Sequence, residues 1–305
     1  MTGRDWTRLL LLAVLWSSSY YFAEIALRGF GPLTIAAGRV TLGAVVLGAW
    51  LGSRGRSLPV DRRSLVSFFA MGLLNNAIPF TLIFWAQIEI ASGVAAILNT
   101  TTPLFSALLA AYLGIERLTV TRMAGLLLGV VGVALVVGGD ELIGTVQAIA
   151  AEGAVLLAAL FYAIAGQFGR RRFAGLDPDI AACGMLVGSS TVLVAPALLI
   201  EQPWRSLPSP GAIIAVGALG LFGAAFAYAL YFRILAGAGA TNLLLVTFLL
   251  PVGALALGST LLGEAVRVPQ LGGLALILVA LALIDGRWIR RLTAPWRPTE
   301  INDSA

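Results

Sequence analysis

The chain contains two stretches with the same layout, TTPLFSALLAAYLGIE at residues 101–116 and LLPVGALALGSTLLGE at residues 249–264. A shift of 148 residues places Pro103 on Pro251 and Glu116 on Glu264. In both stretches a proline lies within an apolar run, and a glutamate follows the proline 13 residues later. A matched pair of this kind indicates that the two halves of the chain are copies of one unit.

The same shift aligns the sequence on both sides of these stretches. It pairs further positions without a gap, namely Leu82 with Leu230, Phe84 with Phe232, Val120 with Val268, and Gly125 with Gly273. A gapless register over this distance favours an internal duplication over chance matches between apolar segments.

The composition indicates the solvent that surrounds both halves. Of the 305 residues, 59% are hydrophobic and 11% are charged, whereas roughly 25% of residues are charged in a soluble domain. A membrane-spanning helix needs about 20 mostly apolar residues, and open strands leave unpaired backbone groups in lipid. We therefore expect an all-α integral membrane protein with ten transmembrane helices, at residues 9–27, 32–52, 64–86, 91–113, 120–138, 145–168, 179–200, 210–235, 241–262 and 269–288.

Each half then contains five spans. Because five is an odd number, the second copy enters the membrane from the opposite side, so the two repeats are inverted about a pseudo-two-fold axis in the membrane plane. The predicted division is a first five-helix repeat at residues 1–138, a second, inverted repeat at residues 139–288, and a disordered cytoplasmic tail at residues 289–305.

The arginines predict the orientation in the membrane. Sixteen of the 20 basic residues fall in alternate loops and near both termini, three fall in the other loops, and Arg39 lies inside a span. Because cytoplasmic loops carry the excess of basic residues, we expect a multi-pass protein of the cell (inner) membrane with both termini in the cytoplasm. Such scattered arginines do not form the basic patch of a protein that binds nucleic acid.

The sequence contains no His, no Lys and a single cysteine, Cys183. These absences argue against a His-containing metal site, a Ser-His-Asp triad, a Schiff-base lysine and a disulfide framework. The loops between the expected spans are too short to fold as a catalytic domain. We therefore expect neither an enzyme nor a bound metal or cofactor.

Several short motifs resemble those of a known family. They are the Leu-Trp-Ser-Ser-Ser segment from Leu15 to Ser19, the pair Pro32 and Arg39 in the second span, and the proline-to-glutamate endings of spans four and nine. With the five-plus-five layout, they resemble the EamA branch of the drug/metabolite transporter superfamily over about residues 9–288. Within that branch the chain is most similar to YddG-type exporters, and this resemblance implies export of amino acids, aromatic ones included.

Three prolines inside spans mark expected helix breaks or hinges. A proline in a helix removes one hydrogen bond and frees the carbonyl group four residues earlier. Near the middle of the membrane, the freed carbonyls would be those of Asn75 for Pro79, Asn99 for Pro103 and Thr247 for Pro251. Interrupted helices at equivalent positions of two repeats indicate a transport site, although neighbouring hydroxyl groups also stabilise prolines in ordinary membrane helices.

Polar and aromatic residues at similar depth are candidates for substrate contacts. Hydroxyl and amide groups bind ammonium or carboxylate groups, and aromatic rings stack on aromatic substrates. The candidates are Ser17, Ser18, Tyr21, Asn75, Asn76, Phe80, Trp85, Asn99, Thr102, Tyr162, Tyr228 and Thr247. The alternative role for any one hydroxyl is a hydrogen bond between helices, worth about 0.6 kcal/mol. For the three asparagines, a hydrogen bond between helices and a position in a water-filled cavity are equally favoured interpretations.

Three charged side chains fall within the spans. Arg39 lies about 10 Å from the outer surface at a helical rise of about 1.5 Å per residue, and Glu24 and Glu152 fall at similar depth. An unpaired charge inside the membrane costs several kcal/mol, so we expect Arg39 to pair with one of the two glutamates. Binding of a substrate carboxylate by Arg39 is the second interpretation.

The charges also restrict the substrate. A phosphorylated substrate would need several basic groups, and a cationic drug would need a carboxylate at the centre. We expect a secondary transporter that exports small net-neutral or zwitterionic metabolites, amino acids among them, by alternating access. A proton relay commonly uses His or a central carboxylate, so we favour facilitated diffusion. The alternatives are a proton-coupled drug/metabolite exporter, an intramembrane enzyme and a passive channel. The oligomeric state stays open between a monomer and a larger assembly.

Overall fold

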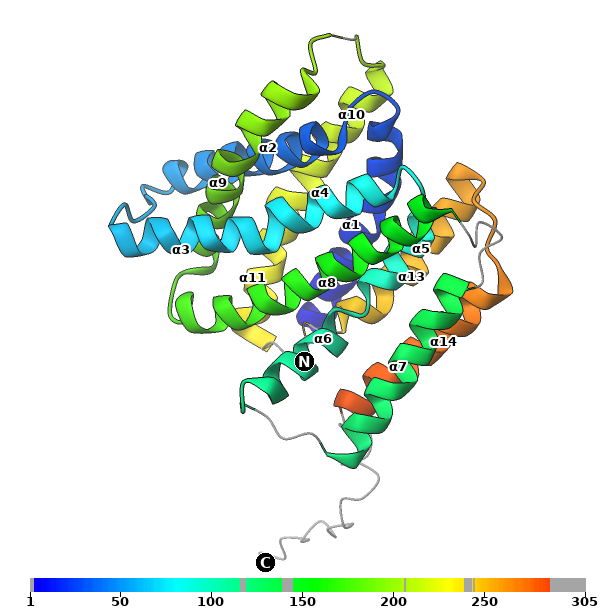
Figure 1. Ribbon diagram of the computed structural model, residues 1–305. Coiled ribbons are helices and arrows are strands. Elements are labelled where there is room, and N and C mark those ends of the chain that lie inside the picture. The colour runs from blue at the N-terminus through cyan, green and yellow to red at the C-terminus, as the bar shows by residue number, and fades with distance from the viewer. Residues whose placement is uncertain are drawn as a thin grey trace, which may run out of the picture.

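The computed structural model describes residues 3–115, 119–138, 145–205, 207–238, 243 and 245–285. In these residues the chain forms helices and no strand (Figure 1). The elements of the first half are α1 (Gly3–Leu27), α2 (Pro32–Ser53), α3 (Arg62–Gly72), the π-helix η1 (Leu73–Ala77), α4 (Ile78–Ala86), α5 (Ser92–Asn99), α6 (Thr102–Tyr112) and α7 (Val120–Gly138).

The second half has a similar series of helices. It consists of α8 (Val146–Arg172), α9 (Pro178–Pro196), η2 (Ala197–Glu201), α10 (Pro210–Ala218), η3 (Leu219–Phe226), α11 (Ala227–Ala238), α13 (Val246–Leu257), η4 (Gly258–Leu262) and α14 (Val268–Asp285). The elements named η are π-helical and continue the α-helices next to them.

The ten expected spans coincide with helical segments of the structure. Within the described residues, eight helices or helix series are long and apolar enough to cross a membrane, and two shorter apolar helices cover residues 246–262 and 268–284. The prediction of an all-helical, multi-pass membrane protein is confirmed. The largest difference at a start is α1, which begins at Gly3 rather than at residue 9. Its first turn contains Asp5, whose negative charge stabilises a helix N-terminus.

Local sequence signals determine where several helices begin. The side chains of Asp61, Thr145, Asp177 and Ser209 each accept a backbone N–H of the following turn, as N-cap residues do. Prolines lie in the first turn of α2, α9 and α10. A proline is tolerated there because its missing N–H would have no partner within the helix.

Helices α7 and α14 pack along each other at one edge of the bundle (Figure 1). Their closest approach is at Gly132 and Gly273. A Cβ atom on Gly273 would lie 2.6 Å from the carbonyl oxygen of Gly132, and a Cβ on Gly132 would lie 2.9 Å from that of Gly273. Only glycine at both positions lets the two backbones come this close.

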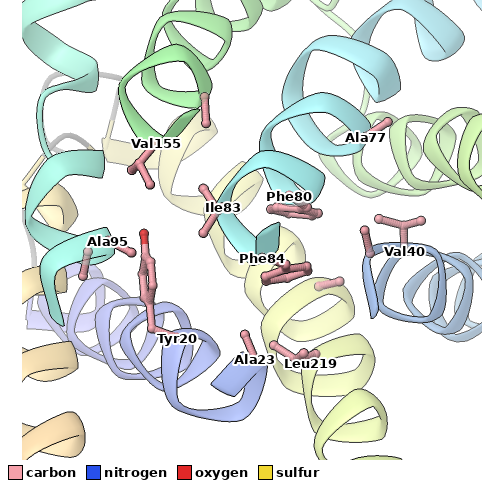
Figure 2. Close-up of a cluster of buried hydrophobic side chains, with 14 of the residues drawn as sticks. Tyr20, Ala23, Val40, Ala77, Phe80, Ile83, Phe84, Ala95, Val155 and Leu219 are labelled. Carbon is pink, nitrogen blue, oxygen red and sulfur yellow. The ribbon is translucent and has the colours of Figure 1, made fainter. Parts of the chain in front are cut away.

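The remaining helices form the larger part of the bundle. Helix α1 packs against α13, α10 and α11, and α8 packs against α4, α5 and α6. Helix α2 packs against α9 and η3, and α3 packs against α9. The largest cluster of buried apolar side chains lies among these helices and includes Phe80, Phe84 and Leu219 (Figure 2).

Polar contacts tie the loops together at each end of the bundle. At one end Arg56 Nη2 lies 2.6 Å from Asp177 Oδ2, and Arg233 Nη2 lies 3.7 Å from Asp179 Oδ1. The hydrogen bond from Arg56 holds the pKa of Asp177 below its ordinary value. These contacts join loops that the arginine count assigns to the cytoplasmic side.

The other end is joined by two carboxylates that bind helix N-termini. Glu201 accepts the N–H groups of Leu33 and Thr34, at 2.9 and 2.7 Å. Glu264 accepts those of Ser92 and Gly93, at 2.9 and 3.2 Å. In each case the carboxylate at the end of one span stabilises the start of another, because N-terminal amides lack partners within their own helix.

Candidate substrate site

At Pro79 the third span widens into a π-helix. Segment η1 covers residues 73–77 directly before Ile78 and Pro79, and α4 continues from there. A π-helical turn accommodates the hydrogen bond that proline cannot donate, and such segments are frequent at functional sites. Both Asn75 and Asn76 lie in η1, and the side chain of Asn76 is fully buried.

The two asparagines join η1 to α9 and α11. Tyr228 donates its hydroxyl proton to Asn76 Oδ1 at 2.5 Å, and Asn75 Nδ2 donates to the Tyr228 hydroxyl at 3.1 Å. Asn76 Nδ2 also donates to Ser189 Oγ at 2.7 Å. Three of these residues belong to the predicted set, whereas Ser189 does not. Its signal in the sequence is a polar pair, Ser189 and Ser190, inside an apolar span.

At Pro103 the fourth span is interrupted. Helix α5 ends at Asn99, a turn follows, and α6 begins at Thr102. The Thr102 hydroxyl donates to the Asn99 carbonyl at 2.8 Å, which is the carbonyl that proline leaves without its helical partner. In the structure Thr102 therefore stabilises the break.

The ninth span behaves differently from the fourth. Pro251 lies inside α13, which runs without interruption from Val246 to Leu257. The expected break at Pro251 is therefore absent from this described helix. Next to the proline, the hydroxyl of Ser17 donates to the Leu250 carbonyl at 3.0 Å. This bond from α1 joins the first span to α13 beside the proline, at a carbonyl other than that of Thr247, which the proline frees. Thr247 lies on α13 and is partly buried.

Asn99 also binds a residue that the sequence analysis did not select. Asn99 Nδ2 donates to the Tyr20 hydroxyl at 2.9 Å, while its Oδ1 is buried without a partner. Figure 2 shows the Tyr20 side chain standing from α1 toward the helices that carry Ala95 and Val155. The predicted residue, Tyr21, is only partly buried and packs against Phe22, with ring centres 5.3 Å apart. Trp16 and Tyr20 are four residues apart and therefore lie on the same face of the helix. This spacing is the sequence signal that could have identified Tyr20.

Arg39 is buried among neutral groups. Arg39 is only 4% exposed. Its Nη2 donates a hydrogen bond to the Gly223 carbonyl at 2.8 Å. Its Cζ lies 4.1 Å from the centre of the Phe80 ring. Its Nε is buried without a partner. A carbonyl dipole and a ring face thus stabilise the guanidinium group.

The expected ion pair of Arg39 with Glu24 or Glu152 is not among the contacts of Arg39 with the described residues. Glu24 lies on α1 within electrostatic range of Arg28 and Glu264 instead. Glu152 is buried on α8. The π-helical segment η3 brings the Gly223 carbonyl to Arg39, and the sequence alone does not reveal this backbone partner 184 residues away.

Three tyrosines lie in the wider neighbourhood of Arg39. Tyr20, Tyr162 and Tyr228 lie within electrostatic range of Arg39. Trp16 packs against Tyr228, with ring centres 6.1 Å apart. The structure thus brings together Arg39, Phe80, Asn75, Asn76, Asn99, Tyr162 and Tyr228 with the additional residues Tyr20, Trp16 and Ser189.

Other predicted residues lie apart from this group. Ser18 donates to the carbonyl of Leu15 in its own helix, at 3.0 Å. Trp85 is 40% exposed. Ser17 and Thr102 bind backbone carbonyls beside prolines, as described above.

Comparison with known proteins identifies similar chains with transport functions. The chain is 26% identical to the "Uncharacterized inner membrane transporter YedA" of Escherichia coli strain K12, over 90% of this chain and 89% of the relative. It is 26% identical to the "Probable terminal-alkyne amino-acid exporter" of Streptantibioticus cattleyicolor, over 93% and 94%. It is 25% identical to the "S-adenosylmethionine/S-adenosylhomocysteine transporter" of Chlamydia trachomatis, over 84% and 81%.

The fold is also similar to a solved crystal structure, with a TM-score of 0.69 and 21% identity over 96% of this chain and 100% of that chain. The EamA-like transporter family matches residues 7–138 and, a second time, residues 150–285. The chain therefore belongs to the EamA-like transporter family, whose members move small metabolites across membranes.

Proposed function

We propose that the protein exports small zwitterionic or net-neutral metabolites, amino acids among them, by alternating access and facilitated diffusion. Arg39 binds the substrate carboxylate in this proposal. The observation that carries it is a guanidinium group that is buried, bound to one carbonyl, and not in contact with any acid of the described residues. A buried cation without a counter-charge favours an anionic ligand group.

The neighbours of Arg39 suit the rest of an amino acid. The amide of Asn99 has a buried Oδ1 without a partner, which is an acceptor for an ammonium group. The rings of Phe80 and Tyr228 supply an apolar, aromatic environment for a side chain. The resemblance to YddG-type exporters adds aromatic amino acids to the expected substrates.

The similar proteins support this class of substrate. One is named for export of a terminal-alkyne amino acid and another for transport of S-adenosylmethionine and S-adenosylhomocysteine. All of these molecules carry an α-amino group and a carboxylate. A site that recognises this shared group is consistent with one buried arginine and a set of neutral hydrogen-bonding side chains.

The proposed architecture is a duplication, with repeats at residues 1–138 and 139–288 and a cytoplasmic tail at residues 289–305. The two separate matches to the family support this division. So do the π-helices of the third and eighth spans, because moving η1 by 148 residues places it at residues 221–225, within η3.

The helix contacts support the proposal of an inverted repeat. The first span packs against the eighth and ninth, as the sixth packs against the third and fourth. The second packs against the eighth, as the seventh packs against the third. Exchanging the repeats therefore reproduces the pattern, which supports two interconvertible states of one architecture.

The proposed orientation has both termini in the cytoplasm of a cell (inner) membrane. It rests on the arginine distribution and on the ion pairs at one end of the bundle. The contact of Glu264 with the start of α5 then lies at the outer end. In alternating access this contact forms when the outer path closes and separates when it opens.

Uptake by vesicles that contain the purified protein tests the proposal. We expect saturable uptake of labelled Trp, Phe, Thr or Met. The Arg39→Gln variant should raise KM by about tenfold or more, because hydrogen bonds to charged groups contribute about 1.5–3 kcal/mol. Arg171→Gln, which removes an exposed arginine, is the matched control. A folded Arg39→Gln protein with unchanged KM would contradict the role of Arg39 in binding the substrate carboxylate. An absence of uptake across a broad panel of amino acids would contradict amino acids as the substrate class.

The same vesicles test the coupling. Facilitated diffusion requires that an imposed pH gradient leaves the final accumulation of substrate unchanged. Concentration of the substrate by the gradient would instead identify a proton-coupled exporter. Glu24 and Glu264, which lie within electrostatic range of each other, are the acids to substitute in that case.

A further inference from the structure

A groove lies at the arginine-rich end of the bundle, between the start of α3 and the end of α8. Its volume is about 440 Å³. Three arginines line it, Arg62 and Arg63 from α3 and Arg172 from α8, together with the apolar side chains of Val66, Ala70 and Phe168. None of its lining residues belongs to the proposed substrate site.

The arginines of this groove have no acidic partner among the described residues. No Asp or Glu is among its lining residues, and none of its three arginines forms an ion pair with another described residue. The two nearest acids in sequence have other partners. Asp61 accepts the N–H of Ser64 at 3.0 Å, and Asp177 binds Arg56.

The apolar wall of the groove continues onto the outer surface of α3. Leu65, Val66 and Phe69 are about half exposed, at 51%, 59% and 49%. They belong to a segment that is apolar enough to cross a membrane. In a membrane, exposed apolar side chains of a span face the hydrocarbon tails, and arginines at the ends of spans lie at the level of the lipid headgroups.

We propose that this groove binds the phosphodiester headgroup of an anionic phospholipid. The guanidinium groups of Arg62, Arg63 and Arg172 supply donors in the planar arrangement that matches phosphate oxygens. The acyl chains lie along Val66 and the exposed face of α3. Basic pockets between membrane helices are known to bind anionic headgroups, and three clustered arginines without acidic partners provide the charge complementarity here.

Native mass spectrometry of the full-length protein with added lipids tests this site. We expect phosphatidylglycerol to bind more tightly than phosphatidylcholine. The double variant Arg62→Gln/Arg172→Gln should weaken phosphatidylglycerol binding about thirtyfold, since each of the two basic residues contributes about 1 kcal/mol near an anionic headgroup. The matched control, Arg4→Gln/Arg171→Gln, loses the same charge from other exposed arginines. It should change binding less than about twofold, because neither residue lines the groove.

Two further measurements complete the test. The first distinguishes a lipid headgroup from free phosphate, and the second distinguishes loss of binding from misfolding. Inorganic phosphate should not compete with the lipid, because it lacks acyl chains to contact Val66 and Phe69. Arg62→Lys/Arg172→Lys keeps the charge but loses the planar guanidinium donors, so its binding should lie between that of the natural protein and that of the glutamine pair. This result separates loss of charge from misfolding. Equal loss in the glutamine pair and its control would overturn the proposal, as would displacement of the lipid by phosphate alone.

Discussion

Glu264 Oε1 accepts the backbone N–H of Ser92 at 2.9 Å, so the end of the ninth span is bonded to the start of the fourth. The two residues are far apart in sequence and belong to different proposed repeats. The second carboxylate oxygen accepts the N–H of Gly93 at 3.2 Å. One side chain thus satisfies two N-terminal amides of α5, and its removal leaves both without this partner.

The Glu264→Gln variant should open this end of the bundle more often. A carboxylate at a helix N-terminus contributes about 0.5–2 kcal/mol, so the maleimide labelling rate of an Ala91→Cys variant should rise about fivefold. The background is Cys183→Ser, which removes the natural thiol. Glu89→Gln, at an exposed glutamate of the same loop, is the control. Equal labelling rates for Glu264→Gln and its control would contradict a clamp at this position.

The bond between Arg56 and Asp177 predicts a dependence of stability on pH. Since Arg56 lowers the pKa of Asp177 in the folded protein, the bond stabilises the fold above the unfolded pKa of about 4. This stabilisation is lost as the pH falls through the folded pKa. Thermal unfolding in detergent should therefore show that Arg56→Gln is destabilising at pH 7 and nearly neutral at the acid end. If the difference in unfolding temperature between Arg56→Gln and the natural protein stays constant with pH, this linkage is excluded. The control is Arg54→Gln, whose effect on the unfolding temperature should not depend on pH in this way.

The contact between α7 and α14 predicts a strong effect of one methyl group. In Gly273→Ala the new Cβ would lie 2.6 Å from the Gly132 carbonyl oxygen, so the helices must separate. Overpacking of this kind costs about 1–3 kcal/mol. The control is Gly153→Ala on α8, where a Cβ has open space and the higher helix propensity of alanine acts alone. If both variants unfold at the same temperature, this close approach is not important for stability.

The Tyr228 hydroxyl predicts the effect of a single oxygen in the candidate site. Tyr228→Phe removes the shorter of two hydrogen bonds to Asn76 Oδ1 and leaves the bond from Asn75 Nδ2 at 3.2 Å. The loss of this bond costs about 0.5–1.5 kcal/mol. We expect a lower unfolding temperature and a higher KM for transported amino acids. Tyr231→Phe, on the neighbouring ring 6.2 Å away, is the control. If Tyr228→Phe and Tyr231→Phe change KM equally, the Tyr228 hydroxyl has no specific role in the candidate site.

The sequence predicted the helical segments well because their causes are local. Length, apolarity and the prolines at the starts of α2, α9 and α10 act within a few residues. It also located the asparagines of η1 and the interruption before Pro103. Each of these features follows from a proline and the polar residues directly preceding it.

Partners across the bundle were harder to predict. The choice between Tyr20 and Tyr21 depends on the rotation of α1 against its neighbours, and one residue turns a side chain by about 100°. Arg39 was expected to bind a carboxylate, but a carbonyl of η3 is its partner. Backbone carbonyls have no residue-specific signal, so no pattern in the sequence marks Gly223 for this contact.

The π-helix η1 makes the site depend on the number of residues before Pro79. A π-helical turn contains one residue more than an α-helical turn. Deleting Leu74 would let the span continue as an ordinary α-helix, so it would still cross the membrane. The segments on either side would keep about the same relative orientation, because the wide turn holds its extra residue without rotating the helix that follows. The change would fall on Asn75 and Asn76, which lie within the wide turn. Insertions and deletions in this segment should therefore alter recognition more than substitutions of its leucines, even where the length of the span hardly changes.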